Sequence, residues 1–225
     1  MKTVGIPGGM GPEATAELYL KIIKIFQKRY GAKYDADFPK IFICNLPLPD
    51  VVETADTGNI VRDRLIEGVK ELESLNVDFI AVPCNTVSFF IDEIRKAVSI
   101  PVLSLPEEVA KIVRERKLRK VGVIGTEMTL RMNLYGKALG KVSAIVPLSD
   151  KIMEITTIIM NILSGDKTDG DRTALLKIIS DLKSEGAQEV ILGCTELPLL
   201  IREKAGIIDT IEVLAEEIVK RAISI

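Results

Sequence analysis

Short apolar runs rich in Val and Ile alternate along the chain with longer segments in which apolar residues recur at helical spacing. The short runs predict buried β-strands, and the longer segments predict amphipathic helices. This alternation favours mainly parallel sheets flanked by helices, which is the α/β class. In such sheets ligands bind beyond the carboxyl ends of the strands. The expected strands are Val4–Ile6, Ile41–Asn45, Phe79–Pro83, Val102–Leu105, the run that begins at Val121, Ala144–Val146 and Val190–Leu192.

Helices are expected to follow most of these strands. Pro12 suits the first turn of a helix, where its missing N–H would have no partner. We expect the first helix to bury one face, formed by Ala16, Tyr19, Leu20, Ile23, Phe26 and Tyr30. The second, Ile60–Leu75, is expected to bury Ile60, Leu65, Val69 and Leu72. The remaining predicted helices are Ser88–Val98, Glu107–Arg116, Ile152–Leu163 and Ala174–Glu185.

The second half of the chain repeats the first. Val121–Thr126 echoes Val4–Gly8, and Ile207–Glu212 echoes Val102–Glu107. The repeat predicts two pseudo-symmetric α/β lobes related by a pseudo-twofold axis. Since each half ends in a strand–helix unit after its cysteine motif, we expect these units to be exchanged. Residues 1–100 and 208–225 would then form the first lobe, and residues 101–207 the second.

The charge balance and hydropathy exclude several classes of partner. Thirty Lys and Arg residues against 32 Asp and Glu residues give a net charge of −2. A nucleic-acid partner is not expected, because there is no basic surplus. No apolar stretch approaches the roughly 18 residues that a membrane span needs. We expect no signal peptide before the first strand. We therefore expect a cytoplasmic protein that binds neither nucleic acid nor membranes.

The chain contains no histidine and only three cysteines. The lack of histidine excludes Ser-His-Asp triads, Cys-His dyads and His-ligated zinc. Three cysteines without a Cys-x-x-Cys spacing give no support to a disulfide scaffold or a metal site. The acid and base groups of an enzyme with this sequence would have to be Cys, Asp, Glu, Lys or Tyr.

Two of the cysteines stand at equivalent places in the repeat. Cys84 lies in Pro83-Cys84-Asn85-Thr86 and Cys194 in Gly193-Cys194-Thr195-Glu196, each between an apolar run and a predicted helix. The duplication predicts one thiol on each side of a shared cleft, which suits proton transfer on opposite faces of one carbon. A helix N-terminus would favour the thiolate at both positions. The alternative is that both are small core residues, as is expected of Cys44, which lies inside a strand.

Three motifs, Gly8–Thr15, Pro83–Thr86 and Gly193–Glu196, together resemble the aspartate/glutamate racemase family. The motifs occur in the family's order, and the strand–helix pattern between them fits from end to end. The family consists of cofactor-independent amino-acid racemases. The resemblance implies that the active site lies in the cleft between the two lobes, with Cys84 and Cys194 as the catalytic acid and base. It also implies an amino-acid substrate, no cofactor, and a homodimer, which is common in the family.

The resemblance further implies substrate-binding groups at the ends of several strands. Backbone amides of the Gly9–Gly11 turn, with Met10 and Gly11 as substrate-binding residues, would add an anion site at the first helix. Asn45 ends the second strand on the ligand's side, although it can equally satisfy a loop backbone. Glu196 would orient the substrate amino group or a thiol. The side chains implied to line the site are Asn85, Thr86, Thr126, Thr129, Thr195 and Glu196.

Three positions depart from the family's usual pattern. Ser88 stands where the first cysteine motif usually has His. Val51 follows Pro-Asp where aspartate-specific members tend to have Arg, and the position of an expected Lys falls near Leu163. Arg62 or Arg131 would have to replace these cations. The sequence therefore predicts a racemase whose side-chain pocket is altered from aspartate, so that it either prefers neutral or apolar amino acids or acts on aspartate only weakly.

Three other functions remain compatible with these residues. One is a related cysteine-dependent isomerase or decarboxylase of carboxylic acids. Another is a non-catalytic amino-acid-binding homologue, which would bind without exchanging the α-proton. The third is a dinucleotide-binding oxidoreductase, because Gly9-x-Gly11-x-x-Ala14 fits a dinucleotide fingerprint. Against the third, the strand Ile41–Asn45 does not end in the acidic residue that would bind a ribose hydroxyl.

Overall fold

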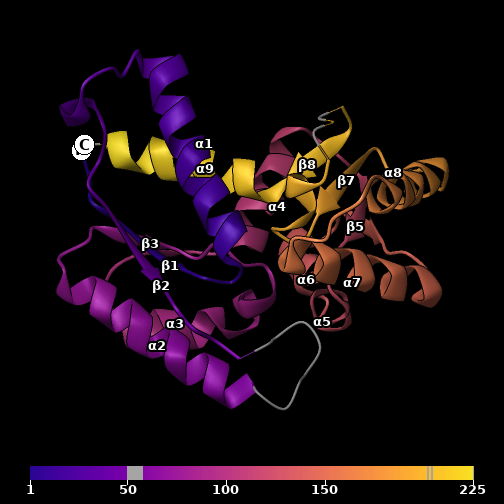
Figure 1. Ribbon diagram of the computed structural model, residues 1–225, viewed down its shortest axis with the longest axis horizontal. Coiled ribbons are helices and arrows are strands. Elements are labelled where there is room, and N and C mark those ends of the chain that lie inside the picture. Colours follow the sequence, from indigo (N-terminus) through magenta and orange to yellow (C-terminus); the bar gives the residue numbers. More distant parts are fainter. Residues whose placement is uncertain (50–57, 202, 204, 225) are drawn as a thin grey trace. The chain divides into compact units, whose positions relative to one another are not determined.

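The computed structural model describes residues 1–49, 58–201, 203 and 205–224. The chain divides into two compact units, Met1–Leu105 with Ile211–Ile225, and Pro106–Thr210. Each unit contains one four-stranded parallel sheet flanked by helices (Figure 1). The predicted α/β class with two parallel sheets is therefore confirmed. Among the described residues, no helix is both long and apolar enough to cross a bilayer.

The first unit is built around a strand that is buried along its whole length, β1 (Val4–Gly8). Its other strands are β2 (Ile41–Asn45), β3 (Phe79–Ala81) and β4 (Val102–Leu103). The helices are α1 (Pro12–Tyr30), α2 (Gly58–Ser74), α3 (Ile91–Ala97) and α9 (Thr210–Ile223), with the 3-10 helices η1 (Asp35–Asp37) and η2 (Thr86–Phe90). The sheet order is β2-β1-β3-β4. Figure 1 shows α2 and α3 on one face of this sheet and α1 and α9 on the other.

The face that α2 buries matches the prediction at three of four positions. Leu65, Val69 and Leu72 are buried in one cluster with Ile80 of β3. Ile60 is 56% exposed, so its predicted burial was wrong. Val61, one residue further, is buried instead. The buried positions 61, 65, 69 and 72 keep the three- and four-residue spacing of a single helix face.

The buried face of α1 differs from the predicted one. Of the six residues expected to be inward, only Phe26 is fully buried; Tyr19, Leu20 and Tyr30 are 41%, 48% and 48% exposed. Apolar residues occupy more than one face of this helix, so spacing alone did not distinguish the face that meets the sheet. The residues that α1 buries are Ala14, Thr15, Leu18, Ile22 and Phe26.

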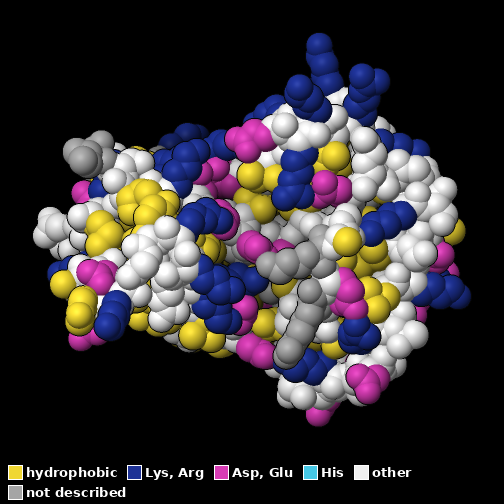
Figure 2. All heavy atoms as spheres, turned by 90° about the horizontal axis from the view of Figure 1, so that it is seen from above, with side chains coloured by type: hydrophobic (Ala, Val, Ile, Leu, Met, Phe, Trp, Pro, Cys, Tyr) yellow, Lys and Arg dark blue, Asp and Glu magenta, His cyan; other side chains and the backbone are white. Residues whose placement is uncertain are grey.

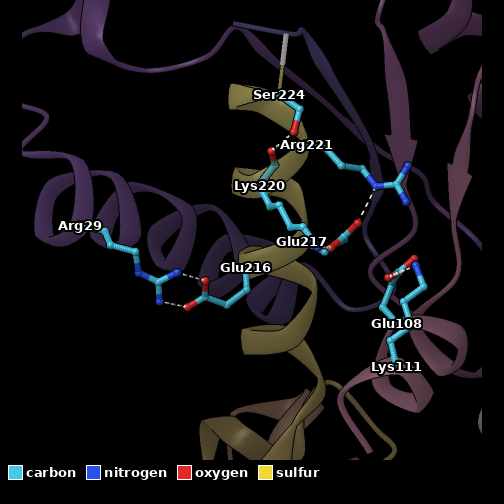
Figure 3. Close-up of polar contacts among 8 residues, drawn as sticks. All are labelled: Arg29, Glu108, Lys111, Glu216, Glu217, Lys220, Arg221 and Ser224. Atoms are coloured by element: carbon cyan, nitrogen blue, oxygen red, sulfur yellow. Dashed lines mark hydrogen bonds and ion pairs between the residues drawn. The ribbon is translucent and has the colours of Figure 1, made fainter. Parts of the chain in front are cut away.

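The C-terminal helix α9 is held in the first unit by contacts with the N-terminal part of the chain. The guanidinium of Arg29 on α1 donates two hydrogen bonds to the Glu216 carboxylate, at 2.5 and 2.6 Å (Figure 3). Lys21 forms a second, longer ion pair with Glu212, at 3.7 Å. The backbone N–H of Lys2 donates to the carbonyl of Ala222 at 2.8 Å.

The second unit repeats the first sheet with the same strand positions. Its strands are β5 (Lys120–Ile124), β6 (Ser143–Ile145), β7 (Glu189–Leu192) and β8 (Ile207–Asp209), all parallel, in the order β6-β5-β7-β8. Its helices are α4 (Leu105–Glu115), α5 (Glu127–Arg131), α6 (Leu134–Leu139), α7 (Ser149–Ser164) and α8 (Asp169–Ser184), with the 3-10 helix η3 (Leu197–Leu199).

The exchange between units involves helices only. β4 pairs with β3 and β8 pairs with β7, so each half of the chain keeps its last strand. The helices that follow, α4 and α9, fall mainly in the other unit. The unit boundaries therefore lie after β4 and after β8. The expected boundaries, after residues 100 and 207, would have placed the last strand of each half in the other unit together with its helix.

A capping box begins α8 and supplies a test of local stability. The hydroxyl of Thr168 accepts the N–H of Asp171 at 3.1 Å, and the Asp171 carboxylate accepts the N–H of Thr168 at 2.9 Å. Burial opposes ionisation of Asp171, but hydrogen bonds from Thr168 and Asn161 outweigh it, and the pKa of this carboxyl lies below its ordinary value.

We expect Thr168→Ala to lower the free energy of unfolding by about 1 kcal/mol at pH 7, because the substitution removes the N-cap acceptor. The Asp171 carboxyl, whose pKa is lowered in the folded state, stabilises the fold only when it is ionised. The difference in the free energy of unfolding between the wild type and Thr168→Ala should therefore narrow as the pH falls below the ordinary carboxyl range. Urea unfolding at pH 7 and pH 3 measures both effects. Thr173→Ala, at an exposed position inside the same helix, is the control and should be neutral or slightly stabilising; equal losses in the two variants would contradict the capping role.

Candidate active site

The first group of predicted site residues lies beyond the carboxyl end of β3. Cys84, Asn85 and Thr86 are 6%, 2% and 8% exposed. The hydroxyl of Ser88 donates to the carbonyl oxygen of Cys84 at 3.2 Å, and the Ser88 N–H donates to Asn85 O at 3.1 Å. Ser88, where the family's usual motif has His, thus fixes the backbone of the cysteine turn.

The turn after β1 lies at the same edge of the sheet. Its Gly9 has φ of +92°, and a Cβ there would lie 2.7 Å from the Leu46 carbonyl oxygen and 3.0 Å from Oδ1 of Asn45. Gly9 is therefore required both by conformation and by the close approach of the chain after β2. Since β2, β1 and β3 are adjacent and parallel, the turn, Asn45 and Cys84 follow neighbouring strands at one edge.

One part of the predicted anion site is already occupied by the protein. The N–H of Gly9 donates to Thr15 Oγ1 at 3.0 Å, and that hydroxyl donates to the Gly11 carbonyl at 3.0 Å. The Gly9 amide is therefore not available to a ligand, which corrects the prediction for the Gly9–Gly11 turn. Met10 is 9% exposed and Gly11 is also buried.

The second group lies beyond the carboxyl end of β7. The thiol of Cys194 donates to Oε2 of Glu196 at 2.9 Å, and the hydroxyl of Thr195 donates to the same oxygen at 3.1 Å. All three side chains are buried, at 6%, 2% and 5% exposed. A buried carboxylate that accepts two hydrogen bonds is partly compensated for its loss of water. This hydrogen bond is the contact that Glu196 would need to orient the thiol, one of the two roles expected of it.

The predicted threonine pair is joined by hydrogen bonds at the end of β5. Thr126 caps α5, because its hydroxyl oxygen accepts the N–H of Thr129 at 3.2 Å. The same hydroxyl donates to Oγ1 of Thr129 at 3.0 Å, and each side chain is 1% exposed. Because β5 pairs with β7, the threonine pair and Cys194 follow neighbouring strands at one edge of the second sheet.

Two glycines allow the ends of β5 and β7 to meet. The N–H of Gly193 donates to the Ile124 carbonyl at 2.6 Å. A Cβ on Gly125 would lie 2.8 Å from the carbonyl oxygen of Gly193. A Cβ on Gly193 would lie 2.9 Å from the Ile124 carbonyl and 3.0 Å from the ring of Tyr135. Neither position accepts a side chain without movement of the backbone that leads into Cys194.

Tyr135 is a neighbour of Cys194 that the sequence analysis missed. It lies on α6 and is 2% exposed. Burial, followed by the charge of Cys194, raises the pKa of the Tyr135 hydroxyl well above its ordinary value. The feature of the sequence that could have identified Tyr135 is a tyrosine next to apolar residues. When such a ring is buried, its hydroxyl requires a polar partner.

The predicted helix dipoles at the two cysteines are weaker than expected. Cys84 is followed by a five-residue 3-10 helix, and Cys194 by the three-residue 3-10 helix η3. Short 3-10 segments align fewer peptide dipoles than α-helices do. The predicted helix Ser88–Val98 is present in part, since η2 runs directly into α3 (Ile91–Ala97), whereas only η3 follows Cys194.

Cys44 is less buried than expected. It lies on β2 at the edge of the first sheet, where it is half-buried and packs against the core cluster. Its sulfur is 4.0 Å from Oε2 of Glu71. Burial, and then the charge of Glu71, raises the pKa of this thiol.

The structure describes some of the positions that depart from the family pattern, and it describes the two arginines expected to replace the missing cations. Val51 lies outside the described residues. Leu163 is 42% exposed in the last turn of α7. Arg62 and Arg131, the proposed substitutes for the missing cations, form local ion pairs with Asp63 at 2.7 Å and with Glu127 at 3.3 Å. Both of these pairs include well-exposed partners.

The described residues contain no group of three or more Cys, Asp or Glu side chains placed to hold a metal ion. The face drawn in Figure 2 carries both signs of charge, with Lys and Arg side chains among Asp and Glu. This mixture agrees with the small net charge of −2.

A family model described as Asp/Glu/Hydantoin racemase matches residues 8–218. The chain belongs to this racemase family. The broad-specificity amino-acid racemase RacX of Bacillus subtilis is 31% identical over 219 residues, 96% of each chain. Family membership confirms the expected enzyme class, the cofactor-independent amino-acid racemases.

Solved structures of this racemase family share the fold over nearly the whole chain. An aspartate racemase homologue from Pyrococcus horikoshii is 28% identical with a TM-score of 0.83 and full coverage of both chains. The aspartate racemase of Picrophilus torridus is 26% identical with a TM-score of 0.80, covering 99% of this chain and 94% of the other. The resemblance predicted from the three motifs is thus confirmed.

Proposed function

We propose that the protein interconverts the L and D enantiomers of amino acids by proton transfer between Cys84, Cys194 and the substrate α-carbon. Inversion requires removal of the α-proton from one face and delivery of a proton to the other. A thiolate accepts the first proton, and a thiol donates the second. After one turnover the two sulfurs have exchanged protonation states, so the same pair serves the reverse reaction.

The observation that supports this proposal most strongly is the matching position of the two cysteines in their own sheets. β3 and β7 hold the same place in the orders β2-β1-β3-β4 and β6-β5-β7-β8. Cys84 follows β3 after two residues and Cys194 follows β7 after one residue, and both are 6% exposed. Buried core cysteines without function would not need polar neighbours, yet each is followed by two buried polar side chains.

The surrounding polar groups supply recognition of the parts common to all amino acids. Asn85, Thr86 and Thr195 are proposed to hold the α-ammonium and α-carboxylate groups. Thr126 and Thr129 would add hydroxyl donors. The backbone of Met10 and Gly11, together with Asn45, would complete the carboxylate site without the Gly9 amide.

The proposed substrates are neutral or apolar amino acids rather than aspartate alone. The broad specificity in the name of the Bacillus subtilis relative favours this range. Leu163 supports it, since an apolar side chain stands near the position where aspartate-specific members tend to have Lys. Arg62 and Arg131 form local ion pairs, which weakens their candidacy as replacements.

We expect the purified protein in heavy water to remove the α-proton NMR signal of several neutral L-amino acids faster than that of L-aspartate. The solvent deuterium replaces the abstracted proton, so the signal falls as racemisation proceeds. A panel of aspartate, glutamate, alanine, serine and leucine tests the range. A strong preference for aspartate would contradict the altered pocket, and no exchange with any member would contradict the racemase function.

We further propose that the protein works in the cytoplasm as a homodimer. The support is the resemblance, since homodimers are common in the family. Light scattering on a sizing column tests the assembly: a species of twice the chain mass of 24.7 kDa is expected. A single peak at the chain mass across the micromolar range would contradict it.

A further inference from the structure

The ring of Tyr135 lies against the backbone that carries Cys194. Its Cε2 atom is 3.0 Å, and its Cδ2 atom 3.6 Å, from the place where a Cβ of Gly193 would stand. Tyr135 is 2% exposed, so the contact is away from water. Because Gly193 lacks a side chain, the ring reaches the peptide unit directly before the thiol.

The segment before Tyr135 is fixed by its own contacts. Thr126 caps α5, and Asn133 connects α5 to α6 in the left-handed region, with φ of +51°. The Asn133 carbonyl accepts the N–H of Lys137 at 3.1 Å. Gly136, next to Tyr135, leaves room for the Asn133 side chain, whose Oδ1 would lie 2.1 Å from a Cβ at that position. The position of the ring is therefore set by the fold rather than by a mobile loop.

Cys194 requires different hydrogen-bond partners as a thiol and as a thiolate. As a thiol it donates its hydrogen to Glu196 at 2.9 Å. When the S–H bond breaks and the proton joins the α-carbon, the sulfur becomes an anion beside a carboxylate, which is unfavourable in a buried site. The thiolate then needs a hydrogen-bond donor, and a neutral phenol is one.

We propose that Tyr135 is a positioning residue for Cys194, whose hydroxyl stabilises the Cys194 thiolate against the repulsion of Glu196. The role rests on the proposed two-cysteine racemisation, in which Cys194 passes through the thiolate state in each turnover. The phenol keeps its own proton throughout and only donates a hydrogen bond. Burial and the charge of Cys194 both raise the pKa of Tyr135, so the hydroxyl remains protonated over the working pH range.

Glu196 and Tyr135 are the titratable side chains that the described contacts bring to Cys194. Asp209 of β8 is nearby in the sheet, in register with Leu192 of β7. The carboxylate that opposes the thiolate is therefore that of Glu196, the N-cap of η3, and Tyr135 is the donor supplied by α6.

The test compares Tyr135→Phe with the wild type. It measures alkylation of Cys194 by iodoacetamide at pH 7, followed by mass spectrometry of the cysteine peptides. Loss of a hydrogen bond to a charged group should slow the alkylation of Cys194 about tenfold. Cys44 serves as the internal reference and should react unchanged. In racemisation, kcat should fall by a similar factor with KM within about twofold, because the thiolate forms during the chemical step.

Two further variants separate the hydroxyl from the ring. Tyr30→Phe, at a 48% exposed tyrosine, should match the wild type in both assays. Tyr135→Leu removes the ring contact with Gly193, and we expect it to lower the melting temperature, which Tyr135→Phe should largely keep. Unchanged alkylation and kcat in Tyr135→Phe would overturn the inference. Slower alkylation in a protein that racemises no amino acid would instead overturn the proposed function, and it would still support an effect of the Tyr135 hydroxyl on the Cys194 thiolate.

Discussion

Cys84→Ser and Cys194→Ser are each expected to lower the rate of inversion about a thousandfold. A serine hydroxyl is a far weaker acid than a thiol, so each variant lacks one of the two proton-transfer groups, and a positioned acid or base contributes factors of this size. Chiral chromatography of the product measures inversion. Cys44→Ser, which changes a half-buried thiol on β2, should keep the wild-type rate.

The same variants report which thiol acts on which enantiomer. A variant that keeps one thiol can still remove the α-proton from the enantiomer that faces it, without inverting the centre. We therefore expect NMR in heavy water to show residual exchange of one enantiomer in Cys84→Ser and of the other in Cys194→Ser. Either variant inverting its substrate at the wild-type rate would contradict the two-cysteine mechanism.

Phe26→Ala is expected to lower the free energy of unfolding by about 3–5 kcal/mol, the usual cost of removing a buried aromatic ring. Phe26 is 1% exposed, and its ring centroid lies 5.7 Å from that of Tyr30 and 6.0 Å from that of Phe38. Because the ring is enclosed, truncation leaves a cavity that the surrounding structure fills only in part. Chemical denaturation at constant pH measures the loss.

Leu20→Ala, on the exposed side of the same helix, is the matched control. Leu20 is 48% exposed, so its truncation should change the free energy of unfolding by no more than about 0.5 kcal/mol. Comparable losses in the two variants would show that α1 buries the face predicted from spacing rather than the one in the structure.

The sequence was informative where a pattern repeats over many residues. Val- and Ile-rich runs located seven of the eight strands in the described part of the chain, and the echo at Ile207 pointed to the eighth, β8. The pair of cysteine motifs located both buried thiols. Such features depend on local hydrophobicity and spacing, which are properties of the chain itself.

The errors arose where contacts distant in sequence decide the outcome. In α1, Leu18 and Ile22 have the same four-residue spacing as other apolar positions, and only the sheet determines which set is buried. After Cys84 a 3-10 helix precedes the α-helix α3, and after Cys194 only the 3-10 helix η3 follows, a distinction that helical spacing in the sequence does not make. The contact of Tyr135 with Gly193 joins positions 58 apart in sequence, and no local pattern encodes it.

The exchange of α4 and α9 between the two units has a consequence for biosynthesis. The first unit contains the N-terminus, yet its α9 lies at the C-terminal end of the chain. Growing chains usually fold their N-terminal domain first. Here the second unit, Pro106–Thr210, leaves the ribosome complete before the first unit has its last helix. The part of the protein that is translated first is therefore the part that finishes folding last.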